Sequence, residues 1–270
     1  MKAIVSVKWL KDHLETPGIV ILNASISKSG AASEASLGEK LIPHTRFFDI
    51  TNKFSEVSAP FPSTFPSVEQ FTNEAQLLGV NQDSMIVVYD DKGIYSSARA
   101  WWLFKAFGHH NVAVLDGGLP EWKKSGYIIE TYQSYLVKKG DFIGVEDNSR
   151  MKFFEEINLA SQTHSHIIID ARSENRFKCL VDEPRAGLRR GTIPNSINLP
   201  YENLLDGNYL KNIDELRHIF QALAHPSDHL IFSCGSGITA CILALGATLV
   251  GYPNISVYDG SWTEYGTMTT

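Results

Sequence analysis

One segment decides the fold that we predict for this chain: Leu230-Ile231-Phe232-Ser233-Cys234-Gly235-Ser236-Gly237-Ile238-Thr239. Its first four residues form a short apolar run of the kind that makes a buried β-strand. Two glycines then allow a tight turn, and the apolar residues 238–250 predict a buried helix. A strand that passes through a glycine loop into a helix is the repeating unit of a parallel sheet with helices on both faces.

The rest of the chain shows the same alternation of strands and helices. Short apolar runs predict further buried strands at Ile19–Leu22, Met85–Tyr89, Val112–Leu115, Ile167–Ile169 and Ile255–Tyr258. Helices are predicted at Ser67–Leu78, Ser96–Phe107 and Ile213–Ala224. We therefore predict an α/β fold with parallel sheets.

The chain also repeats itself. Val20-Ile21-Leu22-Asn23-Ala24 parallels Ile167-Ile168-Ile169-Asp170-Ala171, and Asp116-Gly117 parallels Asp259-Gly260, in each case about 145 residues further along. The 270 residues suffice for two domains of ordinary size. We therefore predict two copies of one domain, at residues 1–130 and 151–270, joined by a polar linker at residues 131–150.

Composition and charge exclude several classes of protein. The chain has 24 Lys and Arg against 30 Asp and Glu, and its net charge of -6 argues against a nucleic-acid or acidic-membrane surface. No charged residue occurs between Leu230 and Tyr258, but the apolar residues 238–250 within that stretch are too few to span a membrane. Five charged residues within residues 1–15 interrupt the apolar pattern that a signal peptide would need, and three cysteines are too few for a disulfide framework. We expect a cytoplasmic protein.

Cys234 is the candidate nucleophile. It follows a predicted strand directly, so it lies at the sheet edge where ligands bind in open α/β folds. The glycines let successive N–H groups point to one spot, and with the following helix N-terminus they favour an anion at the sulfur. The alternative is a glycine-rich turn around an inert buried thiol. Cys241 falls inside the apolar helix and is expected in the core, whereas the role of Cys179, which lies among basic residues, stays open.

A basic segment lies in the same repeat as Cys234. Between Asp170 and Gly191 the chain carries six basic residues and four acidic ones. Guanidinium groups bind carboxylates through paired hydrogen bonds, so two arginines near Cys234 would suit a small α-keto acid. A solvated loop with internal ion pairs is the alternative. Phosphate-ester hydrolysis is not expected, because the sixth residue after Cys234 is Ala240 and not the arginine of Cys-x5-Arg phosphatases.

Together these motifs resemble the tandem rhodanese-domain sulfurtransferases over nearly the whole chain. The resemblance is carried by residues 176–177, 182–189, 191–194, 234–240 and 258–262, and in the first repeat by residues 47–50, 97–102 and 115–118. It implies two rhodanese-like domains. Because Asp90 stands where the second repeat has Cys234, it also implies that the first domain is catalytically silent.

The resemblance implies a reaction as well. The Cys234 thiolate would take the sulfur of 3-mercaptopyruvate as a persulfide, release pyruvate, and pass the sulfur to cyanide or to a thiol acceptor such as thioredoxin, without a cofactor or a metal. Arg176 and Arg185 would bind the carboxylate and keto groups of the substrate, and Ser236 would polarise its thiol. The other substrate-binding positions that the resemblance implies are Gly235, Gly237, Ile238 and Thr239.

The sequence departs from the family pattern at one place. Members usually have an Asp two residues after the Phe-Phe-Asp aspartate and a His roughly a dozen residues later, which complete a relay to the loop serine. Here Thr51 takes the first position and Pro62-Ser63-Thr64 covers the second, so the relay to Ser236 is expected to be absent. A thiosulfate sulfurtransferase and a persulfide carrier without turnover are the alternatives. The uncharged loop favours 3-mercaptopyruvate, since relatives that prefer thiosulfate carry basic residues there.

Overall fold

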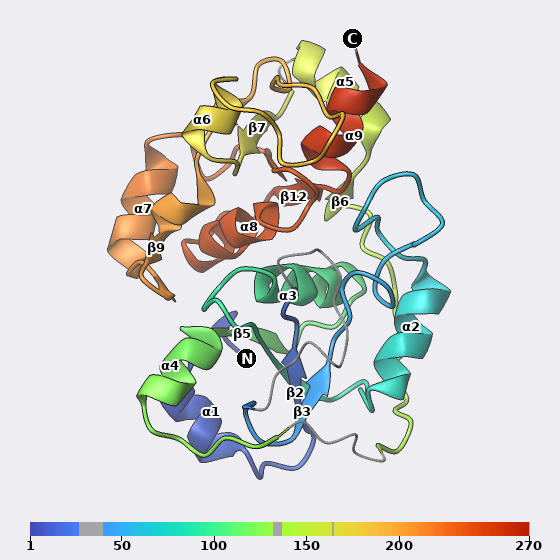
Figure 1. Cartoon of the computed structure of the whole chain (residues 1–270), viewed down its shortest axis with the longest axis vertical. Coiled ribbons are helices and arrows are strands. Elements are labelled where there is room, and N and C mark those ends of the chain that lie inside the picture. The colour runs from blue at the N-terminus through green and yellow to red at the C-terminus, as the bar shows by residue number, and fades with distance from the viewer. Residues whose placement is uncertain (27–39, 132–136, 164, 270) are drawn as a thin grey trace. The chain divides into compact units, whose positions relative to one another are not determined.

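The computed structural model describes residues 1–26, 40–131, 137–163 and 165–269. Its elements group into two compact units, each with a sheet of its own (Figure 1). Unit 1 comprises Met1–Ser58, Phe65–Asp147 and Gly207–Leu210. Unit 2 comprises Ala59–Thr64, Asn148–Asp206 and Lys211–Thr270.

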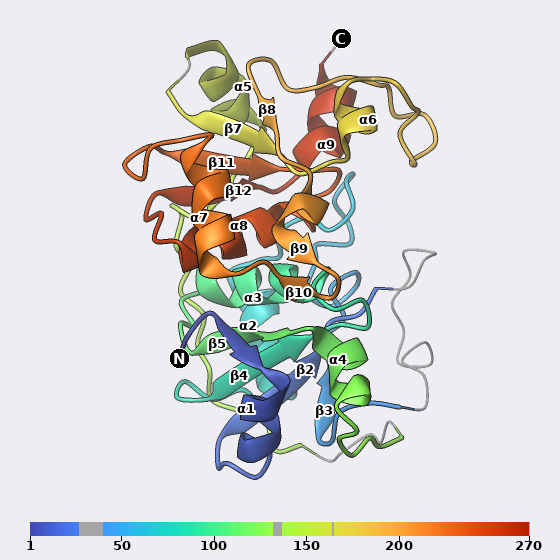
Figure 2. The same cartoon turned by 90° about the vertical axis from the view of Figure 1, so that its left-hand side faces the viewer.

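Unit 1 is built on a five-stranded sheet in the order β1-β5-β4-β2-β3. Its strands, which all pair in parallel, are β1 (Ile4–Ser6), β2 (Ile19–Asn23), β3 (Thr45–Phe47), β4 (Met85–Tyr89) and β5 (Val112–Asp116). One face is covered by α1 (Val7–His13) and α4 (Gly118–Lys124), and the other by α2 (Val68–Leu77) and α3 (Ser97–Ala106) (Figure 2). Strand β10 (Tyr209–Leu210) also belongs to this unit.

Unit 2 repeats this topology with a parallel sheet in the order β6-β12-β11-β7-β8. Its strands are β6 (Met151–Lys152), β7 (Ile167–Asp170), β8 (Ile197–Asn198), β9 (Leu205–Asp206), which lies outside the main sheet, β11 (Leu230–Ser233) and β12 (Ile255–Tyr258). Helices α5 (Phe154–Thr163) and α9 (Ser261–Met268) cover one face, and α7 (Ile213–Gln221) and α8 (Ala240–Leu249) the other (Figure 2). The short helices α6 (Glu174–Phe177) and η2 (Tyr201–Leu204) complete it. The predicted duplication is confirmed by the matching strand orders.

The core of unit 2 explains the long uncharged stretch of sequence. All four residues of β11 and all four of β12 are buried, because both faces of their sheet are covered. Helix α8 buries every residue from Ala240 to Ala247. Charged side chains would therefore be desolvated almost anywhere between Leu230 and Tyr258. None of the helices in the described parts of the chain is long and apolar enough to cross a bilayer.

Part of the predicted linker at residues 131–150 packs against unit 1. The N–H of Phe142 donates to the carbonyl of Val80 (3.1 Å), and the N–H of Val145 donates to the carbonyl of Phe107 (3.0 Å). The Phe142 ring is fully buried beside those of Phe71 and Phe104. One aromatic anchor thus attaches this polar, aperiodic segment to the core, and residues 137–147 belong to unit 1.

Candidate active site

The loop between β11 and α8 presents unpaired backbone donors beside Cys234. Cys234 follows the last residue of β11 and is only 2% exposed. Gly237 has a left-handed φ of +73°, which lets the chain curl around this point. Within the described chain, the N–H groups of Gly235, Ser236, Ile238 and Thr239 donate to no protein acceptor. Four such N–H groups within the five residues that follow Cys234 are donors of the kind that bind an anion.

Arg176 lies directly against this loop. It sits on α6, and a Cβ built on Gly235 would lie 3.0 Å from its Nη2 atom. A side chain at position 235 would therefore displace the guanidinium group. Glu183 accepts hydrogen bonds from Nε (3.2 Å) and Nη2 of Arg176, which fixes the orientation of the fork.

Arg185 reaches the same glycine through Thr263. Its Nη1 donates to the Thr263 hydroxyl (2.8 Å), which in turn donates to the carbonyl of Gly235. Partial burial lowers the pKa of Arg185 from its usual 12.5, a starting value high enough to keep the group charged near neutral pH. Among the described residues no carboxylate pairs with Arg185, so its charge is available to a ligand.

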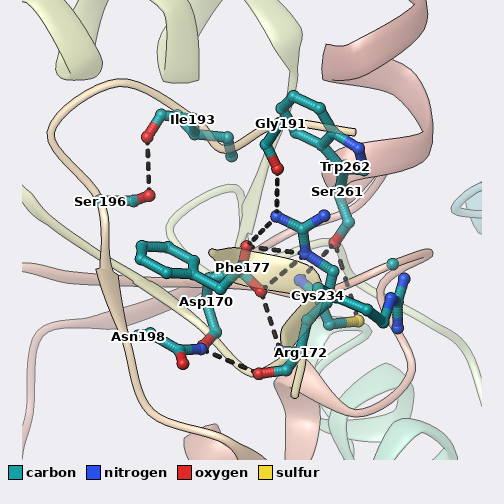
Figure 3. Close-up of polar contacts among 12 residues, drawn as sticks. Asp170, Arg172, Phe177, Gly191, Ile193, Ser196, Asn198, Cys234, Ser261 and Trp262 are labelled. Carbon is teal, nitrogen blue, oxygen red and sulfur yellow. Dashed lines mark hydrogen bonds and ion pairs between the residues drawn. The ribbon is translucent and has the colours of Figure 1, made fainter. Parts of the chain in front are cut away.

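A buried network of charges extends from Asp170 and Arg172, which are labelled in Figure 3, through Glu183 to Arg176. Arg172 is fully buried and donates to both Asp170, through Nη2 (2.7 Å), and Glu183, through Nη1 (2.7 Å). Burial opposes the charge on Arg172, but the two carboxylates outweigh that effect and raise its pKa. The guanidinium also lies over the Trp262 ring, 4.9 Å from its centre. Because Glu183 pairs with both arginines, the buried network sets the position of Arg176.

Ion pairs neutralise much of the rest of the basic segment. Lys178 pairs with Glu174, and Arg190 pairs with Asp182 (2.9 Å). Arg189 donates instead to backbone carbonyls at the end of α9. Internal ion pairs, the alternative interpretation of this segment, therefore account for Lys178 and Arg190. They do not account for Arg185.

The structure brings the predicted site residues together and places the other two cysteines elsewhere. Cys234 and the glycines and Ser236 of its loop lie together with Arg176 and Arg185, which both reach Gly235. Cys241 is fully buried in α8, as expected for a core thiol. Cys179 is half-buried, and its Sγ lies 3.7 Å from the carbonyl oxygen of Phe177.

Three residues of the site have roles that the sequence interpretation missed. Thr263 links Arg185 to the loop, and Glu183 joins the two arginines. Ser261 accepts hydrogen bonds from the N–H groups of Cys234 (3.0 Å) and Gly237 (3.1 Å). A signal existed for Ser261, because the first repeat has Asp-Gly-Gly where the second has Asp-Gly-Ser.

The equivalent loop of unit 1 is already occupied by its own side chain. The Asp90 carboxylate is fully buried and accepts hydrogen bonds from the N–H groups of Lys92 (2.9 Å), Tyr95 (2.8 Å) and Ser97 (2.9 Å). By the repeat, Lys92 and Tyr95 correspond to Ser236 and Thr239, whose N–H groups donate to no protein acceptor in the described structure. The loop of unit 1 therefore binds its own carboxylate, whereas the corresponding N–H groups of unit 2 have no carboxylate acceptor among the described residues.

Comparison with known proteins assigns both halves of the chain to the same domain family. The family model of the rhodanese-like domain matches residues 6–125 and again residues 154–267. Human 3-mercaptopyruvate sulfurtransferase is 36% identical, over 98% of this chain and 92% of that protein. The thiosulfate sulfurtransferase of Cricetulus griseus is 34% identical, over 98% of this chain and 92% of that protein. The crystal structure of SseA from Escherichia coli, a 3-mercaptopyruvate sulfotransferase, superposes with a TM-score of 0.86 at 34% identity, covering 97% of this chain and 99% of that one.

Proposed function

Because this chain belongs to the rhodanese-like domain family and is a sulfurtransferase, we propose that Cys234 carries sulfur from 3-mercaptopyruvate to a thiol acceptor. One observation carries the proposal. Cys234 begins an uncharged loop in which four N–H groups donate to no acceptor among the described residues, and Arg176 and Arg185 both reach the adjacent Gly235. The loop suits a sulfur anion, and the arginines suit the carboxylate and keto oxygens of an α-keto acid.

The first half-reaction moves one sulfur atom to the enzyme. The Cys234 thiolate attacks the thiol sulfur of 3-mercaptopyruvate, so a sulfur–sulfur bond forms and the carbon–sulfur bond breaks. The electron pair of the broken bond leaves as the enolate of pyruvate, which takes a proton from solvent to become pyruvate. Arg176 and Arg185 hold the carboxylate and the developing enolate oxygen. The proton of the substrate thiol stays on the outer sulfur of the persulfide.

The second half-reaction returns the enzyme to its starting state. An acceptor thiolate attacks the outer sulfur, a new sulfur–sulfur bond forms on the acceptor, and Cys234 leaves as a thiolate. The N–H groups of the loop stabilise that leaving anion. We propose reduced thioredoxin as the acceptor and the cytoplasm as the compartment. All three cysteines are free thiols, which is typical of a reducing environment.

Ser236 is proposed to donate its hydroxyl to the substrate thiol. Its side chain is half-buried in the loop next to Gly235, where the substrate would enter. At the position of the family's relay aspartate, Thr51 of unit 1 donates its own hydroxyl to Asp49 (3.0 Å). A hydroxyl that polarises the thiol through a hydrogen bond needs no change in its own protonation, so this role does not require the relay.

A steady-state comparison of two sulfur donors tests the choice of substrate. With cyanide as acceptor, we expect kcat/KM for 3-mercaptopyruvate to exceed that for thiosulfate by about tenfold or more, because one carboxylate matches the available charge of Arg185. Intact-mass measurement after exposure to 3-mercaptopyruvate alone should show one added sulfur atom. A preference for thiosulfate would contradict the proposed substrate, and an adduct without repeated turnover would favour the carrier alternative.

Substituting Arg185 should weaken substrate binding more than chemistry. In Arg185→Ala we expect KM for 3-mercaptopyruvate to rise by about 10- to 100-fold, since a charged hydrogen bond to the substrate is lost. Arg217→Ala is the matched control, because Arg217 lies on the exposed face of α7 and pairs there with Asp214 of the same helix. An unchanged KM in Arg185→Ala would remove this arginine from the substrate site.

A further inference from the structure

Ser261 adopts a backbone conformation that serine rarely adopts. It begins α9 with a left-handed φ of +50°. Its side chain is fully buried, so the conformation is imposed by the packing around it. Such a residue costs about 1–3 kcal/mol of stability and persists where other contacts compensate for it.

The contacts that compensate for this strain join the Ser261 hydroxyl to the Cys234 loop and to the carbonyl of Tyr258, at the end of β12. The hydroxyl oxygen accepts from the N–H groups of Cys234 (3.0 Å) and Gly237 (3.1 Å), at the two ends of the tight turn. It lies 2.9 Å from the carbonyl oxygen of Tyr258 and 3.9 Å from Sγ of Cys234, toward which it points in Figure 3. A hydroxyl has one proton to donate, so that proton goes either to Tyr258 or to the sulfur.

Unit 1 supplies an internal comparison for this position. Its counterpart of Ser261 is Gly118, which has nearly the same φ of +51°. A Cβ at Gly118 would lie 2.5 Å from the carbonyl oxygen of Gly93 and 2.7 Å from that of Asp90, so no side chain fits. The unit whose loop holds its own carboxylate therefore uses an unstrained glycine, and the unit with the cysteine uses a strained serine.

We propose that Ser261 is a positioning residue that fixes the Cys234 loop and donates a hydrogen bond to the sulfur, without transferring its proton, whenever the sulfur is negatively charged. The two accepted hydrogen bonds hold Cys234 and Gly237 in place. A charged sulfur is a better acceptor than the neutral Tyr258 carbonyl, so ionisation shifts the hydroxyl hydrogen from one to the other. The serine thereby favours the attacking thiolate in the first half-reaction and the leaving thiolate in the second. This inference rests on the proposed function, in which Cys234 is the nucleophile.

Two variants separate the hydroxyl from the backbone strain. Ser261→Ala removes the hydroxyl and keeps the strained conformation, whereas Ser261→Gly removes both. We expect the pH profile of Cys234 alkylation by iodoacetamide, followed by peptide mass spectrometry, to move up by about one pH unit in both variants. Alkylation at neutral pH should then be about tenfold slower. Ser261→Gly should melt no lower than the parent protein, so slow alkylation there cannot result from unfolding.

Ser256→Ala is the matched control. Ser256 is a buried serine on β12 whose hydroxyl donates to the carbonyl of Leu230 (3.4 Å), away from the loop. Its alkylation profile should equal that of the parent. A parent-like profile in Ser261→Gly would overturn the inference. Failure of the proposed function has a different signature: Cys234 alkylates normally in the parent, but the parent gains no sulfur from 3-mercaptopyruvate.

Discussion

Replacing Cys234 with serine should reduce sulfur transfer by about 10³-fold or more, because the hydroxyl of serine does not ionise near neutral pH and cannot form a persulfide. The substitution exchanges one atom of a buried side chain that is only 2% exposed. We therefore expect the folded structure to survive. Turnover with 3-mercaptopyruvate and cyanide measures the loss of activity, and intact mass after exposure to the donor should show no added sulfur.

Cys179→Ser is the matched control for this prediction. Cys179 is half-buried on the loop after α6 and is not part of the proposed site. Its variant should turn over within about twofold of the parent and should still gain one sulfur. Persistent turnover in Cys234→Ser, or loss of the adduct in Cys179→Ser, would contradict the assignment of the nucleophile.

Replacing Arg172 with methionine should destabilise unit 2 by about 3–5 kcal/mol. The change leaves the carboxylates of Asp170 and Glu183, each only 1% exposed at the side chain, without the cation between them. Without Arg172, Glu183 can change its position and take Arg176 with it. The KM for the keto acid should therefore rise in the fraction of the protein that stays folded. Arg172→Lys keeps the charge but loses the planar fork, and its destabilisation should be intermediate.

Hydrogen exchange can locate this loss of stability within the chain. Protection of the amides in β7 and β11 reports on unit 2, while protection in β4 reports on unit 1 and serves as an internal reference. Arg217→Met is the control for removal of an exposed arginine, with an expected change within about 0.5 kcal/mol. Unchanged exchange of β7 in Arg172→Met would show that the buried network contributes little.

The buried strands and the cysteine loop were predictable because their signals are local. Runs such as Met85–Tyr89 and Leu230–Ser233 are uniformly apolar, and the structure has strands with these same bounds. The glycines after Cys234 predict a turn, and the turn places the thiol at the carboxyl edge of the sheet. The short strands β1, β3, β6 and β8 were not predicted, since two or three residues are too few to show a periodicity.

The supporting contacts of the site could not be predicted, because they join residues distant in the chain. Glu183 lies within the family motif at residues 182–189, but its hydrogen bonds to Arg172 and Arg176 depend on the path of the loop between them. The link from Arg185 to Thr263 joins residues that lie 78 positions apart in the sequence. The left-handed conformation of Ser261 is likewise set by packing, since serine has no intrinsic preference for it.

In unit 1 the Asp90 side chain takes the place that a bound anion would have, because its carboxylate accepts the hydrogen bonds of the loop. Its loop is satisfied at every anion concentration, so dissolved anions have no vacant site there to bind. Among the described residues no carboxylate accepts from the corresponding N–H groups of unit 2, so an anion bound there would stabilise the folded state by mass action, by about 2.7 kcal/mol at a concentration 100 times its Kd. The two copies of the domain therefore differ in one respect: the loop of unit 1 has its acceptor within the chain, whereas the stability of unit 2 would rise with the concentration of any anion that its loop binds.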